Sequence, residues 1–95
     1  MFIKRNYNRK KFLNFTVVVP VHSNTTIKKF SKCLKSIFFS TVIPKEILIC
    51  VDGPIPENLE KFLNNLKKKN IKLFFLKKNC GLGKLLSKAI PRCKF

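Results

Sequence analysis

Phe15–Val21, with the sequence FTVVVPV, is a nearly unbroken apolar run rich in β-branched residues. A run of this kind predicts a strand that is buried on both faces of a parallel sheet. Similar runs occupy 46–51 and 71–76, and segments with apolar residues at helical spacing follow the three runs near 27–38, 56–69 and 82–90. Strands that alternate with helices predict an α/β fold, here a partial Rossmann-like parallel sheet in the order β-α-β-α-β-α.

The helical segments carry recognisable ends. Asn24 or Thr25 can cap the first helix, and Pro56 can occupy the first turn of the second. Lys67, Lys68 and Lys69 would close that second helix at its negative end. The predicted inner face of the first helix consists of Ile27, Phe30, Cys33, Leu34, Ile37 and Phe38.

Ninety-five residues allow at most one domain, and 21 basic residues against four acids give a formal charge of +17. Two interpretations of this charge stay open. It can attract nucleic acid, anionic lipid or nucleotide phosphate, or it can reflect solvated faces and the drift of an AT-rich genome. The basic residues are lysines apart from Arg5, Arg9 and Arg92. Recognition of nucleobase edges in DNA or RNA favours arginine instead.

The chain divides into a basic N-terminal arm at 1–14 and an α/β domain at 15–95. The arm lacks the apolar region of a signal peptide, and no run in the chain approaches the length of a membrane span. The four cysteines form no Cys-x-x-Cys pair, so we expect free thiols in a reducing cytoplasm, with Cys33 and Cys50 as small core residues.

The loops at 20–24, 52–54 and 79–84 follow the three predicted strands, so we expect them to lie together at the carboxyl ends of a parallel sheet. Parallel sheets bind their ligands outside these ends. Asp52 is the only Asp of the chain and follows the second strand. Its carboxylate can accept hydrogen bonds from a ribose or a base, or it can be a turn or cap residue. Neither the dinucleotide-binding Gly-x-Gly-x-x-Gly motif nor a P-loop is present. His22 has no visible Ser, Cys or Asp partner in the sequence, so we do not expect it to be catalytic.

The three loops resemble the N-terminal part of family 2 glycosyltransferases, nucleotide-diphospho-sugar transferases with the GT-A fold. The segment at 15–24 is similar to that family's Val-Ile-Ile-Pro-Val-Tyr-Asn. The segment at 46–53 resembles its second strand, which usually ends Asp-Asp-Gly-Ser. The segment Asn79-x-Gly81-Leu82-Gly83-Lys84 resembles its Asn-x-Gly-x-x-x-Ala turn, in the version of amylovoran-type, polysaccharide-assembling members.

The resemblance implies that the α/β domain at 15–95 is a truncated nucleotide-sugar-binding domain. Asp52 matches the carboxylate that binds the base, Pro20 and His22 match the loop on the nucleoside, and Gly81 and Lys84 lie in the turn near the diphosphate. This chain departs from the family in Val51, which replaces the first Asp of the pair, and in His22, which replaces a Tyr.

The implied function is transfer of a sugar from a nucleotide-diphospho-sugar to a surface polysaccharide or lipid-linked saccharide. An intact relative would use Mg²⁺ or Mn²⁺, but the chain shows no Asp-x-Asp metal site and no catalytic base, because one free carboxylate cannot fill both roles. We therefore expect an inactive, truncated portion with no catalytic or metal-binding residue of its own. We place it in the cytoplasm, alone or against the inner face of the membrane. The alternative is a small basic nucleic-acid-binding module without catalysis.

Overall fold

A computed structural model of the chain describes residues 11–66 and 70–95. Three parallel strands form one sheet in the order β1-β2-β3: β1 (Lys11–Val21), β2 (Val42–Asp52) and β3 (Ile71–Leu76). The helices are α2 (Ile27–Phe38), α3 (Glu57–Asn64) and α4 (Leu82–Ala89), followed by the short 3₁₀ helix η1 (Ile90–Arg92). The predicted α/β fold, a parallel sheet that alternates with helices, is confirmed.

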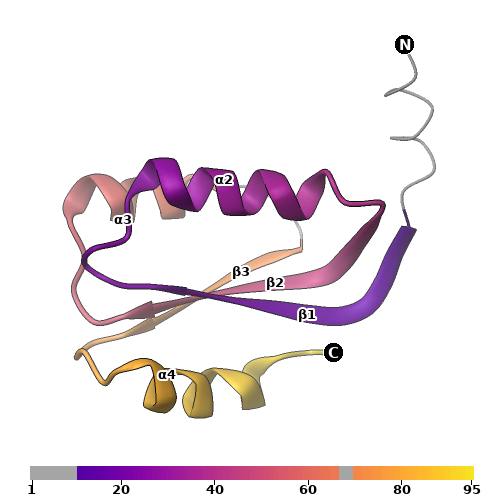
Figure 1. Ribbon diagram of the computed structural model, residues 1–95. Coiled ribbons are helices and arrows are strands. Elements are labelled where there is room, and N and C mark those ends of the chain that lie inside the picture. The colour runs from indigo at the N-terminus through magenta and orange to yellow at the C-terminus, as the bar shows by residue number, and fades with distance from the viewer. Residues whose placement is uncertain (1–10, 67–69) are drawn as a thin grey trace.

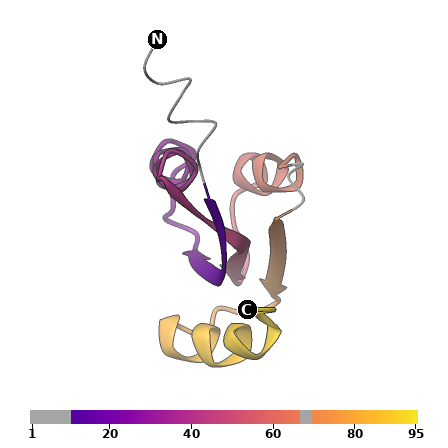
Figure 2. The same cartoon turned by 90° about the vertical axis from the view of Figure 1, so that its right-hand side faces the viewer.

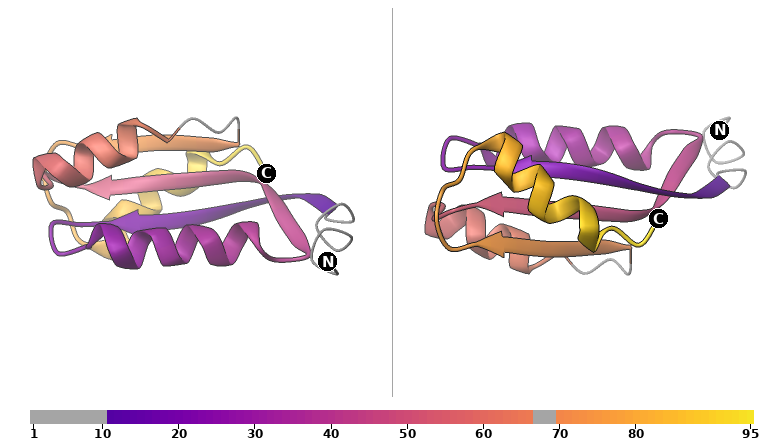
Figure 3. Two further views of the ribbon diagram at one scale, coloured as in Figure 1. Left: turned by 90° about the horizontal axis from the view of Figure 1, so that it is seen from above. Right: turned by 90° about the horizontal axis from the view of Figure 1, so that it is seen from below.

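The sheet lies between two layers of helix. Figures 1 and 2 show α2 and α3 side by side on one face and α4 on the other. Seen along the sheet normal, α2 follows β1 closely, whereas α4 crosses the opposite face obliquely (Figure 3). Connections of this kind leave the carboxyl ends of all three strands at one edge of the sheet.

The larger core fills the space between the sheet and the helices α2 and α3. Phe30 of α2 and Phe62 of α3 meet edge to face, with ring centroids 6.1 Å apart, and so join the two helices. The buried members are Val19, Val21, Phe30, Leu34, Ile47, Ile49, Val51, Leu59 and Leu63. A smaller core, consisting of Leu48, Cys50, Leu85 and Ala89, joins β2 to α4.

Two strands begin earlier than the sequence pattern predicts. β1 begins at Lys11 instead of Phe15, and β2 begins at Val42 instead of Glu46. The added residues pair with one another, with Lys11 opposite Val42. Residues 11–14 of the predicted basic arm therefore belong to β1, and the rest of that arm lies outside the described residues, as do Lys67–Lys69.

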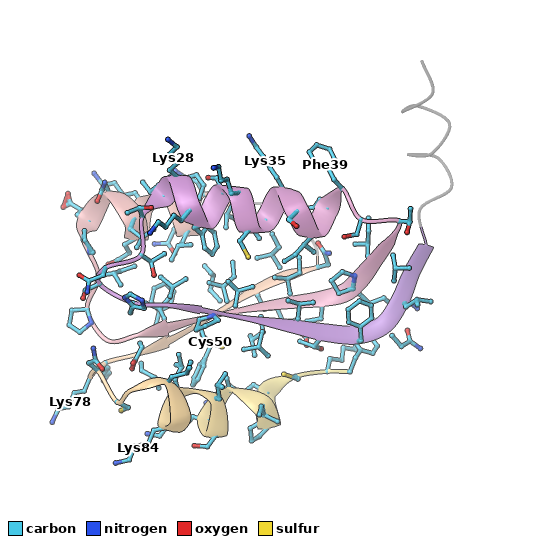
Figure 4. The ribbon with its side chains drawn as sticks, viewed as in Figure 1. Lys28, Lys35, Phe39, Cys50, Lys78 and Lys84 are labelled. Atoms are coloured by element: carbon cyan, nitrogen blue, oxygen red, sulfur yellow. The ribbon has the colours of Figure 1, made fainter. Side chains whose placement is uncertain are left out.

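The first helix differs from the prediction in two details. Its N-cap is Thr26, whose side chain accepts a hydrogen bond from the Lys29 N–H at 3.2 Å. Cys33 is exposed, because it lies on the flank of α2 where the helix surface turns away from the sheet. Cys50, by contrast, is fully buried between the sheet and α4 (Figure 4), and burial, with a contribution from Cys93, raises its thiol pKa to about 11.

Candidate functional site

A hollow of about 270 Å³ opens at the carboxyl edge of the sheet. The loops that follow β1 and β3 meet there, beside the end of β2 and the start of α4. Its lining residues are Pro20, Val21, His22, Ser23, Asn24, Asp52, Asn79, Gly81, Leu82 and Leu85. This is the edge at which parallel α/β sheets bind their ligands.

Four of the five residues that the sequence places in a nucleotide site line this hollow. They are Pro20, His22, Asp52 and Gly81. Lys84 does not line it: the side chain is exposed and points away from the sheet (Figure 4). The reason is helical geometry, because the next residue, Leu85, is the one that packs into the core against β2.

Asp52 ends β2, and only 6% of its surface is exposed. Its two carboxylate oxygens hold the loop after β3: Oδ1 accepts the Cys80 N–H at 2.8 Å and Oδ2 accepts the Gly81 N–H at 3.0 Å. Asp52 thus holds the loop after β3 against the end of β2. An ionised carboxylate has about four lone-pair sites, so after these two bonds it can still accept hydrogen bonds from a molecule in the hollow.

Two glycines adopt backbone conformations that the loops require, and Gly53 also permits their close approach. Gly53 has a φ of +81°, and a Cβ added there would lie 2.6 Å from the backbone nitrogen of Asn79. Gly81, the N-cap of α4, has φ +85° and ψ 162°, a backbone conformation that residues other than glycine rarely adopt. The side chain of Asn79 accepts a further hydrogen bond from the Gly81 N–H at 3.2 Å.

The loop after β1 is held by its own hydrogen bonds. The His22 N–H donates to Thr25 Oγ1 at 3.0 Å, and the Thr25 N–H returns to the His22 carbonyl at 3.0 Å. His22 Nδ1 accepts the Asn24 N–H at 3.0 Å, which assigns the proton of the neutral ring to Nε2. The imidazole is therefore fixed locally and keeps one N–H donor, at Nε2, for other contacts.

The hollow combines an apolar wall with a few polar groups. Pro20, Val21, Leu82 and Leu85 supply the apolar surface, and Leu82 is 58% exposed. Asp52, His22 and Asn79 supply acceptors and donors around it. Small-molecule sites in proteins commonly combine an apolar wall with a few polar groups in this way.

The described residues do not fit a divalent cation. Within 11–66 and 70–95, no three His, Cys, Asp or Glu side chains come together in a way that could hold a metal. The one carboxylate at the hollow, Asp52, faces backbone N–H donors instead of further oxygen ligands. We therefore derive no metal-dependent step from this site.

Sequence reasoning missed a second buried carboxylate. Glu46 is only 2% exposed and lies on the same face of β2 as Asp52. Oε1 accepts the Lys94 N–H at 2.7 Å and the Thr16 hydroxyl at 2.8 Å, and Oε2 forms an ion pair with Lys72 Nζ at 3.0 Å. The available signal was a carboxylate directly ahead of the buried run 47–51.

Burial alone would raise the pKa of Glu46. The hydrogen bond from the Lys94 N–H, together with the contacts from Lys72 and Thr16, outweighs burial and lowers the pKa below its ordinary value of 4.5. Glu46 is therefore ionised in the folded protein at neutral pH, and it contributes to packing of the C-terminal segment, not to the hollow.

Comparison with known proteins gives two similar curated enzymes. The chain is 32% identical over 80 residues to the UDP-Gal:alpha-D-GlcNAc-diphosphoundecaprenol beta-1,3-galactosyltransferase of Escherichia coli. It is 30% identical over 83 residues to the amylovoran biosynthesis glycosyltransferase AmsE of Erwinia amylovora. Each match covers 83% of this chain and 29% and 30%, respectively, of the two relatives, so the chain spans about three tenths of their length. No protein-family model matches the chain, and no solved structure matches it. The chain is thus similar to two glycosyltransferases over most of its own length.

Proposed function

We propose that this chain is the nucleotide-binding portion of a glycosyltransferase with the N-terminal half of a GT-A fold, and that the hollow binds the nucleoside of a nucleotide-diphospho-sugar. The observation that carries the proposal is the position of Asp52, a buried carboxylate with spare lone pairs at the carboxyl edge of a parallel sheet. The similarity to two glycosyltransferases over 83% of the chain supports it.

The nucleoside would be held by complementary groups. A spare lone pair of Asp52 would accept a hydrogen bond from an imino N–H of the base or from a ribose hydroxyl. Pro20 and Leu82 would contact the faces of the ring, and His22 Nε2–H would donate to an oxygen of the nucleotide. Each bond to the carboxylate would contribute about 1.5–3 kcal/mol to binding, because the acceptor is charged.

The diphosphate would lie at the start of α4. The N–H groups of Leu82, Gly83 and Lys84 belong to the first helical turn and have no acceptor within the helix. The positive end of the helix favours an anion there. Gly83 adds no side chain to obstruct it. In this arrangement Lys84 contributes its charge from the outer side of the helix.

The names of the two relatives support a proposal for the donor and acceptor classes. The name of the Escherichia coli enzyme specifies UDP-galactose as donor and a diphosphoundecaprenol-linked sugar as acceptor, and that of the Erwinia amylovora enzyme specifies amylovoran biosynthesis. We propose a nucleotide-diphospho-sugar donor and a lipid-linked or polysaccharide acceptor for the enzyme of which this sequence forms the nucleotide-binding portion. Its place of action would be the cytoplasm.

Titration of the ¹⁵N-labelled chain with uridine and guanosine diphosphates tests this proposal by amide chemical shifts. We expect saturable shifts at His22, Cys80 and Gly81 at concentrations up to the millimolar range. Leu82→Trp should fill the hollow and abolish them. Ile90→Trp is the matched control, because Ile90 is equally exposed, at 60%, and does not line the hollow. Absence of saturable shifts around the hollow, or equal binding by both Trp variants, would rule out the proposed site.

A further inference from the structure

The outer face of α2 carries a line of basic side chains that ends in an aromatic ring. Lys28, Lys32, Lys35 and Phe39 follow one another at intervals of four, three and four residues, so they share one side of the helix. The side chains of Lys28, Lys35 and Phe39 all project away from the sheet (Figure 4). We refer to these four residues as the α2 stripe.

The charge of the stripe is not neutralised within the described part of the chain. α2 contains no acidic residue. The ion pairs of residues 11–66 and 70–95 join Lys61 to Glu57 and Lys72 to Glu46, and neither involves the stripe. Three lysines along one helix therefore present an uncompensated positive field.

The ring at the end of the stripe distinguishes one anionic partner from others. Phe39 is 73% exposed, the largest value among the exposed large apolar residues of the described chain. An aromatic ring beside lysines gains little from double-stranded nucleic acid, whose bases are already stacked, but it gains hydrophobic energy when it enters the interface of a lipid bilayer. Lysine stems can likewise lie along the bilayer surface while the ammonium groups reach the phosphates.

We infer that the α2 stripe is a docking surface for an anionic lipid bilayer, with the lysines on the phosphates and Phe39 inserted at the headgroup level. The stripe and α4 lie on opposite faces of the sheet (Figure 1). Docking through the stripe would therefore leave the hollow beside α4 open to its ligand. This inference stands independently of the proposed function, since it rests on a different face of the molecule.

Co-sedimentation of the full chain with lipid vesicles tests it. Binding should require phosphatidylglycerol mixed into phosphatidylcholine. Replacing the stripe lysines by Gln (Lys28, Lys32 and Lys35) should weaken partitioning by roughly fivefold per lysine, about a hundredfold together. The matched control replaces Lys77, Lys78 and Lys88 by Gln, an equal loss of charge at exposed positions outside α2, and should weaken it by less than about fivefold.

The substitution Phe39→Ser distinguishes docking on a lipid bilayer from binding of a polyanion by charge alone. It should weaken vesicle binding by about tenfold and leave binding to a double-stranded oligonucleotide unchanged. Rising salt should remove the lysine contribution before that of Phe39. Equal loss with both lysine triples would overturn the inference. So would a Phe39→Ser variant that binds vesicles normally, a result that would assign the stripe to polyanions in general, nucleic acid included.

Discussion

Glu46 and Asp52 lie on the same face of β2, six residues apart, and their carboxylates hold the two ends of the segment that carries α4. Asp52 accepts the N–H groups of Cys80 and Gly81 ahead of the helix, and Glu46 accepts the N–H of Lys94 after it. Carboxylate bonds to backbone N–H groups are charge-assisted and stronger than neutral ones. The smaller core under α4 therefore lies between two polar anchors on one strand.

Asp52→Asn should destabilise the fold by about 1.5–3 kcal/mol, because the amide replaces one charged acceptor with a donor that faces a backbone N–H. Urea unfolding measures this change. Hydrogen exchange at the amides of Cys80 and Gly81 should also become faster, since the loop after β3 loses an anchor.

Asn79→Ala is the control for this change, since its side chain accepts only the longer 3.2 Å bond from Gly81 N–H. We expect it to cost at most about 1 kcal/mol. An Asp52→Asn protein with normal stability and normal amide protection would show that the two short bonds do not hold the loop.

Gly53→Ala should destabilise the fold by about 1–3 kcal/mol, because φ is +81° and the new Cβ would meet the Asn79 backbone. Gly83→Ala provides the contrast: Gly83 is helical and has no neighbour within 4 Å of an added Cβ. It should stabilise the protein by up to about 1 kcal/mol. Thermal melts of both variants measure the difference, and equal effects would contradict the close approach of the two loops.

Elements defined by local pattern were predictable from the sequence. β3 occupies Ile71–Leu76 and α4 begins at Leu82, both as predicted. The meeting of the loops at 20–24, 52 and 79–82 was also predictable, because the carboxyl ends of parallel strands share one edge.

Features that depend on distant partners were not predictable. The first residues of β1 and β2 are strand because they pair with each other, although Asn14 and Lys45 interrupt the apolar pattern. The cap of the first helix was predicted at Asn24 or Thr25, which is wrong, because the local sequence does not rank these two residues against the adjacent Thr26. The structure uses Thr26 for the helix and Thr25 for the His22 N–H. Glu46 finds partners 30 and 48 residues away, which no local pattern reveals.

The lowered pKa of Glu46 predicts that stability falls in acid. A carboxyl group whose pKa is lower in the folded than in the unfolded state stabilises the fold fully above its ordinary pKa of 4.5 and loses that contribution as pH falls below it. Urea unfolding at a series of pH values should show this loss in the natural chain as an acid limb, a range of low pH in which the free energy of unfolding falls as pH falls. Glu46→Gln should lower stability at neutral pH by about 1–3 kcal/mol and flatten the acid limb, because the titrating group is gone. Glu60→Gln removes an exposed carboxylate on α3 and should leave the limb unchanged. An acid limb that is as steep in Glu46→Gln as in Glu60→Gln would assign the acid sensitivity to another group.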